Sequence, residues 1–526
     1  MFAACTLFLA ACGKQTVKIM TPPDASNRVL FSAEQLQTTL DKAGYQVMMQ
    51  QGDTTFSDPE IKTILLTEVN DTTLKKEGFH ITTTGNLTRV SGRDGSGVIY
   101  GCRELIDRVN DSEGKLNFPE ELKDGPEMVL RGACVGLQKM TYLPGHGVYE
   151  YPYTPESFPW FYDKEQWIKY LDMLVANRMN SLYLWNGHPF ASLVKLEDYP
   201  FALEVDEETF KKNEEMFSFL TEEADKRGIF VIQMFYNIIL SKPFAEHYGL
   251  KTQDRNRPIT PLIADYTRKS IAAFIEKYPN VGLLVCLGEA MCTVEDDVEW
   301  FTKTIIPGVK DGLQALGRTD EPPLLLRAHD TDCKLVMDAA LPIYKNLYTM
   351  HKYNGESLTT YEPRGPWSKI HTDLSSLGSI HISNVHILAN LEPFRWGSPD
   401  FVQKAVQAMH NVHGANALHL YPQASYWDWP YTADKLPNGE REFQLDRDWI
   451  WYQTWGRYAW NSHRDRADEI GYWNHQLGQF YGTSDENAGN IRIAYEESGE
   501  IAPKLLRRFG ITEGNRQTLL LGMFMS

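Results

Sequence analysis

The chain has 526 residues, of which 42% are hydrophobic and 23% charged, and its formal net charge is −17. This composition is typical of folded soluble proteins and excludes disordered, collagen-like and disulfide-stapled chains. At roughly 150 residues per domain, the length predicts three domains or one large barrel with appendages. Because phosphate backbones repel an acidic chain, we expect no nucleic-acid partner. Aromatic residues make up 12% of the chain, and their faces can stack on sugar rings, so carbohydrate is a ligand class to test.

Residues 1–13 are predicted to be a lipoprotein signal peptide. Leu9-Ala10-Ala11-Cys12 resembles a bacterial lipobox, in which small residues precede a cysteine that is lipidated after cleavage. No Lys or Arg precedes Lys14, so either the start lies further upstream or the match is accidental. No other stretch approaches the roughly 18 apolar residues that cross a bilayer. The expected location is the periplasm or the outer membrane of a Gram-negative bacterium, with membrane contact through a lipid anchor alone.

Residues 14–125 are predicted to form a small α/β accessory domain. Its apolar runs and turn residues indicate strands, a helix opened by Ser32 and ended by Gly44, and a hairpin that turns at Gly85-Asn86. The glycine cluster at 95–101 matches no phosphate-binding motif, and we expect a structural turn onto a helix at 102–109. The predicted strands are residues 17–20, 45–49, 61–67, 78–82 and 87–91.

Residues 128–440 are predicted to form a (β/α)8 barrel, because short apolar runs alternate with amphipathic stretches of helical period. The predicted strands are residues 129–137, 181–185, 229–234, 281–287, 324–328, 346–350, 381–389 and 417–421. Helices are predicted at 165–177, 213–227, 264–278 and 298–316.

Residues 441–526 are predicted to be a helical C-terminal region. Its aromatic run from Trp449 to Trp460 is expected to pack this region, and the apolar residues 519–524 favour a chain that continues to a packing partner. Five cysteines lie outside the signal, so at least one is unpaired, and we expect buried structural thiols without metal-ligand spacing. They are Cys102, Cys134, Cys286, Cys292 and Cys333.

In a barrel, the active site lies where the strands end, so polar residues directly after each strand are the candidates. They include carboxylates, cations and tryptophans, a combination that suits glycoside hydrolysis by a general acid and a second carboxylate. The candidate catalytic residues are Glu289, Glu356 and Glu392. The candidate substrate-binding residues are Trp185, Asn186, His188, Arg327, Lys352, Trp396, Trp427 and Asp428.

Glu289 is the strongest single position, because it follows a continuous apolar run and burial there would raise its pKa as a general acid requires. A carboxylate that caps the next helix is the alternative. Glu392 is predicted to be catalytic or sugar-binding, and Glu356 to be catalytic or part of a loop salt bridge. Arg327 either binds a substrate carboxylate or neutralises Glu289.

Other catalytic classes find little support in the motifs. The stretch from His329 to Cys333 could supply metal ligands, but no second cluster at ligand spacing accompanies it, so we expect no metal and no cofactor. His371, His381 and His386 do not share one strand face and are expected to be unrelated. No G-x-S-x-G elbow is present, which argues against a serine hydrolase.

Four short motifs give the chain a family resemblance. They are Gly95–Arg103, similar to a Gly-x-Leu-Tyr-Gly step shared with hexosaminidase accessory domains; Leu326-Arg327-Ala328, similar to Trp-Arg-Ala; residues 351–356 continuing to Tyr361-Glu362-Pro363, similar to a Lys-Tyr-Gly segment ending in Glu-Pro; and residues 455–461, similar to Phe-Gly-Arg-Leu-Ala-Trp. Together they resemble the α-glucuronidases of glycoside hydrolase family 67, which implies an accessory domain, a catalytic barrel and a helical C-terminal region.

The resemblance implies that Glu289 is the general acid and that Glu392 contributes to the base function. The sixth-strand aspartate of the family has no clear counterpart, and Glu356 is the nearest carboxylate. A family lysine that helps to hold the uronate is replaced by Val285, whereas Arg327 is retained. One of the two basic side chains expected to bind a uronate carboxylate is therefore missing, and a neutral sugar is the alternative substrate.

The leading hypothesis is an exo-acting, inverting glycoside hydrolase that removes a sugar from an oligosaccharide or polysaccharide. The first alternative is a catalytically silent glycan-binding lipoprotein that has lost its base. The second is a polysaccharide lyase, for which His188, Tyr236 and Arg327 could serve, although no spacing selects it.

Overall fold

The computed structural model describes residues 15–53, 59–137, 152–236, 239–289, 291–356, 358–385, 397–422 and 429–504. The chain divides into two compact units. The first comprises Met1–Pro126 with Lys226–Gly228, and the second comprises Glu127–Asp225 with Ile229–Ser526.

The first unit is a six-stranded mixed sheet in the order β2-β1-β3-β5-β4-β6 with two helices that pack on each other. The predicted hairpin is confirmed, since β4 and β5 pair antiparallel across a turn in which Gly85 has a φ of +58°. The elements are β1 (Thr16–Thr21), α1 (Asn27–Lys42), β2 (Gln46–Gln51), β3 (Lys62–Glu68), β4 (Phe79–Thr84), β5 (Leu87–Gly92), α2 (Gly95–Asp111) and β6 (Glu121–Asp124).

Two local predictions in this unit are wrong. Helix α1 begins at Asn27 with Ser26 as its cap, whereas Ser32 is buried inside the helix and donates a hydrogen bond to the Arg28 carbonyl at 2.7 Å. The glycine cluster belongs to α2, which begins at Gly95 under the cap Asp94, and does not form a turn before the helix. A Cβ at Gly101 would lie 2.5 Å from the Val90 side chain, so glycine lets α2 approach β5 closely.

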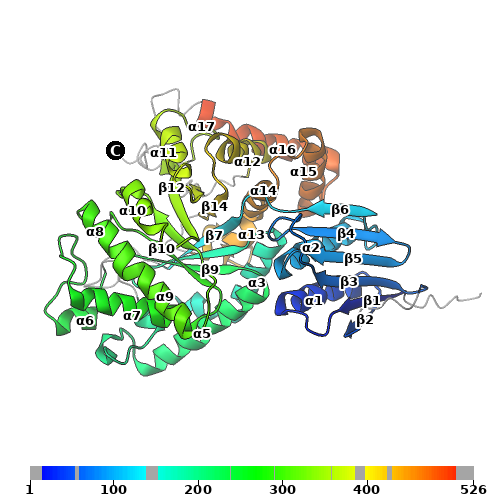
Figure 1. Cartoon of the computed structure of the whole chain (residues 1–526). Helices are drawn as coiled ribbons and strands as arrows, with labels where there is room; N and C mark the ends of the chain where they lie inside the picture. Colours follow the sequence, from blue (N-terminus) through cyan, green and yellow to red (C-terminus); the bar gives the residue numbers. More distant parts are fainter. Residues whose placement is uncertain are drawn as a thin grey trace, which may run out of the picture. The chain divides into compact units, whose positions relative to one another are not determined.

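The second unit contains the predicted barrel. All eight predicted strands are confirmed, and they close in the order β10-β11-β12-β13-β14-β7-β8-β9 with every neighbouring pair parallel (Figure 1). The strands are β7 (Leu130–Gly136), β8 (Ser181–Trp185), β9 (Phe230–Phe235), β10 (Val281–Val285), β11 (Leu324–Arg327), β12 (Leu347–Glu356), β13 (Ile380–Val385) and β14 (Ala417–Leu420).

Helices follow the strands and cover the outside of the barrel, as α7 to α10 show in Figure 1. They are α3 (Lys164–Ala176), α4 (Phe190–Leu193), α5 (Glu207–Lys226), α6 (Lys242–His247), α7 (Pro261–Lys277), α8 (Val294–Trp300), α9 (Ile306–Ala315), α10 (Cys333–Ala340), α11 (Pro366–Ser375) and α12 (Pro399–Gln407). Short 3₁₀ turns occur at Pro159–Tyr162 and Pro200–Ala202, and π-helical turns at Phe301–Ile305 and Ala408–Val412.

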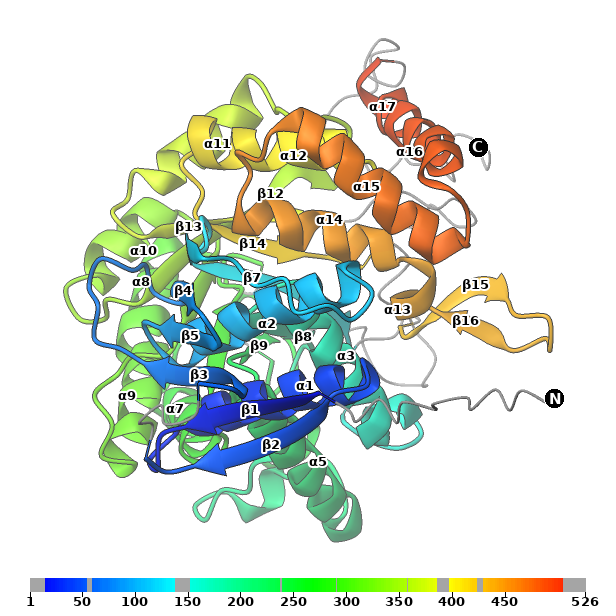
Figure 2. The ribbon, with the colours of Figure 1, turned by 90° about the vertical axis from the view of Figure 1, so that its right-hand side faces the viewer.

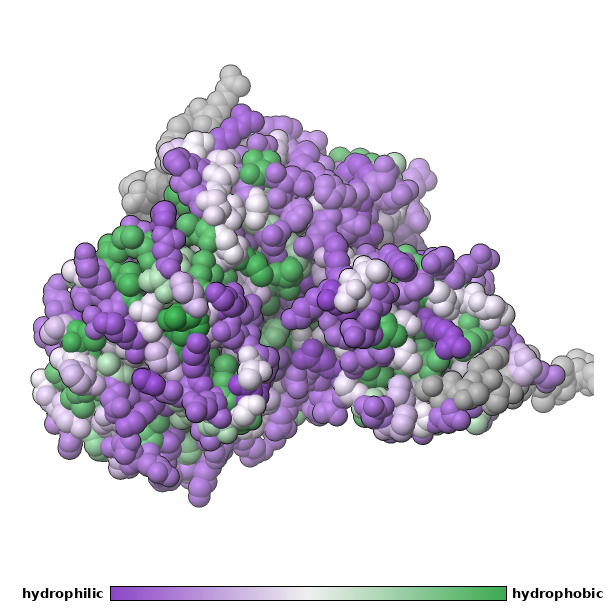
Figure 3. All heavy atoms as spheres, viewed as in Figure 1, coloured by the Kyte–Doolittle hydropathy of each residue, from purple (hydrophilic) through white to green (hydrophobic). Residues whose placement is uncertain are grey.

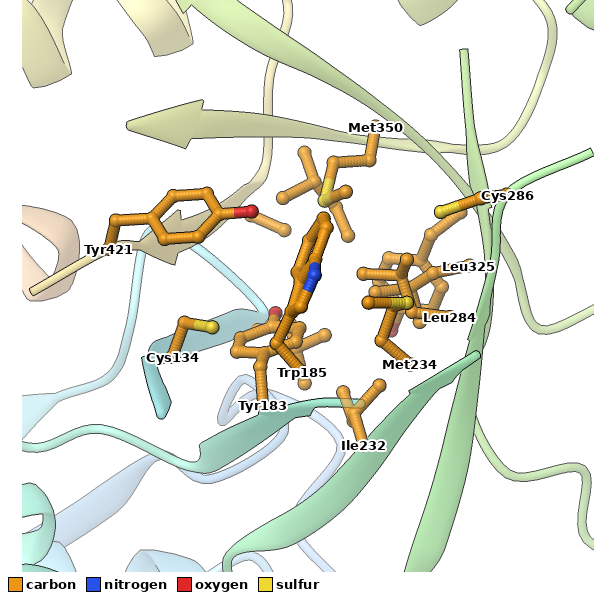
Figure 4. Packing of buried hydrophobic residues seen from close by; sticks show 14 of the residues in the cluster. Cys134, Tyr183, Trp185, Ile232, Met234, Leu284, Cys286, Leu325, Met350 and Tyr421 are labelled. Carbon is orange, nitrogen blue, oxygen red and sulfur yellow. The ribbon is translucent and has the colours of Figure 1, made fainter. Parts of the chain in front are cut away.

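Side chains fill the interior of the barrel. Residues two apart on one strand point to the same side, so Tyr183 and Trp185 of β8 both enter the core, as do Ile232 and Met234 of β9 (Figure 4). The Trp185 ring lies between these strands and Met350 and Tyr421 on the far side. Because the interior is packed, a ligand can be bound only beyond the strand ends.

The C-terminal helices belong to the same unit as the barrel. In α14 the side chains of Trp451, Trp455 and Trp460 are buried, which confirms that the aromatic run serves packing. A small hairpin precedes these helices and extends away from α13 in Figure 2. The elements are β15 (Tyr431–Lys435), β16 (Arg441–Phe443), α13 (Gln444–Arg447), α14 (Trp449–Trp460), α15 (Arg466–Tyr481), α16 (Asp485–Gly499) and α17 (Ile501–Lys504).

On the face drawn in Figure 3, hydrophilic side chains predominate and apolar ones are scattered among them. Among the described residues, no helix combines the length and the apolar character that crossing a bilayer would need. The five cysteines are free thiols, of which Cys292 is exposed and the other four are buried.

Candidate active site

Glu289 lies just beyond the end of β10 and contacts two basic side chains. Its Oε2 accepts a hydrogen bond from Arg327 Nη1 at 2.8 Å, and its Oε1 lies 3.2 Å from His329 Nε2. The exposed fraction of the side chain is 22% for Glu289, 6% for Arg327 and 40% for His329. The carboxylate is therefore recessed, and only its histidine partner is widely open to water.

Arg327 is the last residue of β11 and is held from two further sides. Its Nη1 lies 3.8 Å from Cys286 Sγ, and its guanidinium stands 5.2 Å from the centre of the Trp185 ring, a cation–π distance. Trp185 was predicted to bind substrate, but the structure buries it to 3% exposure in the barrel core. Its observed contact is with Arg327, so it helps to orient the cation that faces Glu289.

The loops after β10 and β11 pack tightly on each other. Gly288 N donates to Thr331 Oγ1 at 3.1 Å, and a Cβ at Gly288 would lie 1.8 Å from the Asp330 carbonyl oxygen. Arg255 Nη2 donates to the Gly288 carbonyl at 2.6 Å. Only glycine fits at residue 288, and this close approach brings His329 to the carboxylate of the next residue.

The electrostatic surroundings of Glu289 overturn the prediction of a raised pKa. Burial alone would raise the pKa of this carboxyl, but Arg327, His329, a hydrogen bond from Tyr236 and Lys352 together outweigh it, so its pKa lies below the ordinary value of 4.5. The prediction considered the apolar run that precedes Glu289, but not the cations that later strands bring to it.

The sixth strand supplies Lys352 and ends at Glu356. Lys352 is buried, and its charge lowers the pKa of Glu289 and of His329. The end of the strand is anchored by side chains, since Tyr353 hydroxyl donates to the Tyr361 carbonyl at 2.8 Å and Asn354 Nδ2 to Thr359 Oγ1 at 2.6 Å. The backbone of Glu356 is the last position of β12, and its side chain lies outside the described part of the chain.

Asn186 and His188 make buried internal contacts. Asn186 Nδ2 donates to the Leu137 carbonyl at 3.0 Å, and Asn186 Oδ1 accepts from the His188 backbone at 2.9 Å. The His188 ring lies 3.5 Å from the Tyr266 hydroxyl, and burial lowers the pKa of His188 to about 4. Both residues shape the turn after β8, and their contact with substrate stays a prediction.

Four predicted site residues lie outside the described residues: Glu392, Trp396, Trp427 and Asp428. The structure therefore brings together Glu289, Arg327, Trp185 and Lys352 from the predicted set. Among the described residues, no group of three or more histidines, cysteines or carboxylates is arranged to hold a metal.

The structure adds His329 and Tyr236 to the surroundings of Glu289. The signal for His329 is its place directly after the end of β11, where the residues of a barrel's active site are expected. The prediction that His371 and His381 are unrelated is wrong, since their rings hydrogen-bond at 2.8 Å. They come from α11 and β13, which only the folded barrel brings together; His386 lies outside the described residues.

The arrangement can hold an anion and move a proton. Arg327 and Lys352 provide fixed positive charge, Glu289 provides an ionisable carboxyl, and His329 reaches solvent. A recessed carboxyl at the mouth of a barrel is the position expected of a general acid in glycoside hydrolysis.

Comparison with solved structures finds a match of high identity. A GH138 enzyme that targets pectin rhamnogalacturonan II is 75% identical to this chain, with a TM-score of 0.90, over 96% of this chain and 72% of that one. No protein-family profile and no curated protein matches the chain.

Two more distant structures share the fold alone. The N-acetyl-β-hexosaminidase of Streptomyces plicatus is 12% identical with a TM-score of 0.53, over 88% of this chain and 91% of that one. The β-N-acetylhexosaminidase of Bacteroides fragilis is 14% identical with a TM-score of 0.52, over 90% and 95%. The coarse prediction of a glycoside hydrolase is thus confirmed, and family 138 replaces the family 67 suggested by the short motifs.

Proposed function

Since the chain belongs to glycoside hydrolase family 138, we propose that it hydrolyses a glycosidic bond in the pectic polysaccharide rhamnogalacturonan II. The observation that carries this proposal is the 75% identity to an enzyme that targets this polysaccharide, over nearly the whole chain. The recessed Glu289 between Arg327 and His329 supports it independently, because a recessed carboxyl at the barrel mouth suits one of the two carboxyl groups that glycoside hydrolysis requires.

In this proposal Glu289 is the general acid that protonates the leaving oxygen. A second carboxylate acts on the sugar carbon or on the attacking water, and Glu356 at the end of β12 and Glu392 after β13 are the candidates. Inversion at the anomeric carbon stays a prediction, and NMR of the first-formed anomer tests it.

The sugar removed is proposed to be a terminal uronic acid. Pectic glycans carry carboxylates, and a buried arginine and a buried lysine that both act on Glu289 suit a bound anion. Because these cations lie below the surface, they can contact the terminal sugar of a glycan more readily than a sugar in its middle. This supports exo action. Hydrolysis of acidic oligosaccharides should exceed that of their carboxyl-reduced forms.

The test is the replacement Glu289→Gln, assayed on rhamnogalacturonan II oligosaccharides. Turnover should fall by about 10²–10⁴-fold, the usual contribution of general acid–base catalysis, without a change in the melting temperature beyond a few degrees. Glu299→Gln is the matched control, because Glu299 is an exposed carboxylate of α8 that forms a surface ion pair with Lys303. An active Glu289→Gln enzyme would refute the assignment.

The wild-type product profile separates the alternatives. Binding of the oligosaccharides without turnover would favour a silent glycan-binding protein, and an unsaturated product would favour a lyase. Either result would overturn the proposed hydrolysis, whereas release of a saturated terminal sugar would support it.

We also propose that the chain is a lipoprotein anchored at the outer membrane or in the periplasm through Cys12. The lipobox-like Leu9-Ala10-Ala11-Cys12 supports this. Expression in a Gram-negative host with radiolabelled palmitate should label the wild type and the control Cys5→Ala, but not Cys12→Ala. Label retained by Cys12→Ala would refute the anchor.

A further inference from the structure

The two oxygens of Glu289 face chemically different partners. Oε2 accepts from Arg327 Nη1 at 2.8 Å, and Oε1 lies 3.2 Å from His329 Nε2. A guanidinium keeps all its protons in proteins, so it donates to Oε2 and cannot exchange a proton with it. A proton that is to be transferred to substrate therefore resides on Oε1.

His329 is the titratable partner of that oxygen. Its side chain is 40% exposed, whereas that of Glu289 is 22% exposed and that of Arg327 is 6% exposed. Imidazole takes up and releases protons near neutral pH, and both of its nitrogens can do so. One edge of the ring can thus exchange with solvent while Nε2 faces Oε1. Tyr236 also hydrogen-bonds to the carboxylate, but a phenol binds no additional proton in this pH range.

Groups on several elements act on the His329 ring. Lys352 of β12 and Arg327 of β11 disfavour its protonation, whereas Glu289 and the neighbouring Asp330, whose Oδ2 lies 3.9 Å away, favour it. Burial has the largest effect on the pKa of His329 and lowers it, and the charge of His329 in turn lowers the pKa of the buried His351. The histidine and the carboxyl are close enough to titrate as one pair.

We propose that His329 is the positioning residue that holds Glu289 Oε1 and replenishes the proton this oxygen gives to the leaving group. The assignment rests on the proposed function. A solvent proton is taken up by the imidazole, Nε2–H passes it to Oε1, and Oε1–H passes it to the glycosidic oxygen as the bond from that oxygen to the sugar carbon breaks. Each uptake replaces one proton delivered, and water completes the hydrolysis.

The low pKa of Glu289 agrees with a separate proton donor that recharges this carboxyl. Burial would raise the pKa of this carboxyl, but the surrounding cations and the Tyr236 hydrogen bond together hold it below the ordinary value of 4.5. Paired with an imidazole, the site retains one proton to a higher pH. Removal of the imidazole should therefore move the alkaline limb of the pH profile toward lower pH.

Three variants test the assignment: His329→Ala, His329→Gln and the control His475→Ala. His475 is a matched control, because its side chain is 38% exposed and its Nδ1 lies 3.7 Å from Asp485 Oδ2, on α15 and α16. For both His329 variants, the alkaline limb of the kcat/KM profile on a pectic oligosaccharide should move to lower pH by about one unit. The rate at pH 7 should fall by about 10-fold or more. Compared with His329→Ala, the His329→Gln variant should bind substrate better, because an amide can donate to Oε1. Its alkaline limb should stay at the lower pH, because an amide cannot titrate.

The dependence on leaving group distinguishes proton delivery from a structural effect. With a dinitrophenyl glycoside of the sugar released by the wild type, which needs little acid assistance, the His329 variants should retain nearly full activity. An unchanged limb, a limb that moves to higher pH, or an equal loss on both substrates would overturn the assignment. A wild type that hydrolyses no pectic oligosaccharide would instead overturn the proposed function, so the two failures are distinct.

Discussion

Two histidine sites in the same barrel behave in opposite ways. His329 follows β11, reaches solvent and lies 3.2 Å from the Glu289 carboxylate. His371 of α11 and His381 of β13 are fully buried and contact each other at 2.8 Å. Solvent access and a nearby carboxylate suit the proton transfer proposed for His329, whereas burial makes His371 and His381 neutral structural groups.

The buried pair has a defined direction of hydrogen bonding. His371 Nε2 lies 3.1 Å from the Tyr353 carbonyl and must donate to it, so His371 Nδ1 accepts from His381 Nε2. His381 Nδ1 then accepts from the Thr349 hydroxyl at 3.0 Å. Each ring is neutral in one tautomer. Burial lowers the pKa of His381 to about 3 and that of His371 well below its ordinary value.

This histidine chain (Thr349, His381, His371) ties α11 and β13 to the end of β12. His371 hydrogen-bonds to the carbonyl of Tyr353, which lies three residues before Glu356. The last residue of β12 that pairs with β13 is Lys352, so this contact holds the backbone just beyond the paired part of the strand. The histidine chain therefore supports the backbone that carries the candidate carboxylate Glu356, whereas His329 contacts another candidate, Glu289.

Replacing the buried cation should give the largest effect. Arg327→Met would remove the charge that contributes most to lowering the pKa of Glu289 against the effect of burial, so this pKa should rise. We expect kcat/KM on an acidic oligosaccharide to fall by about 10²–10³-fold, because a buried charge partner is lost. Arg318→Met, at an exposed pair with Asp320, should retain activity; comparable losses in both variants would contradict the prediction.

For stability, we expect the larger effect at the buried His371 and the smaller effect at the partly exposed His329. His371→Leu leaves His381 Nε2 and the Tyr353 carbonyl without their partner, so the free energy of unfolding should fall by about 2–4 kcal/mol. His329→Ala, at a partly exposed site, should change it by less than about 0.5 kcal/mol. Urea denaturation measures both, and equal losses would remove the distinction between the two sites.

The pH dependence of stability sharpens the same contrast. The unfolded chain binds protons at histidine near pH 6.5, whereas folded His381 does so only near pH 3. The stability that its neutral form provides is therefore complete above pH 6.5 and is lost as the pH falls toward 3. The loss should reach about 1.4 kcal/mol per pH unit. In melting curves from pH 7 to 5, His381→Leu should depend less on pH than the wild type; an unchanged slope would contradict this.

The smallest effect is expected at the end of the histidine chain. Thr349→Val keeps the shape but removes the hydroxyl that donates to His381, which should cost about 1 kcal/mol of stability. The exposed Thr372→Val, whose hydroxyl bonds only locally to the Lys369 carbonyl, is the control. A larger loss of stability in Thr372→Val than in Thr349→Val would show that the buried Thr349 hydroxyl does not stabilise the histidine chain.

Much of the fold could be predicted from local patterns. Apolar runs such as residues 281–285 mark strands that are buried on both faces, and all eight of them appear in the barrel. Cap positions were less accessible, because Ser26 and Ser32 are both plausible N-caps and only the packing of α1 decides between them.

The sequence by itself determined that Glu289 follows the fourth strand of a barrel and that Arg327 ends the fifth. Only the tertiary structure decided that these side chains meet, that His329 takes the second carboxylate oxygen and that Trp185 is buried beneath the arginine. The prediction for the pKa of Glu289 failed for the same reason. Burial can be inferred from neighbours along the chain, but charge interactions depend on distances between strands, which exist only after the barrel has closed.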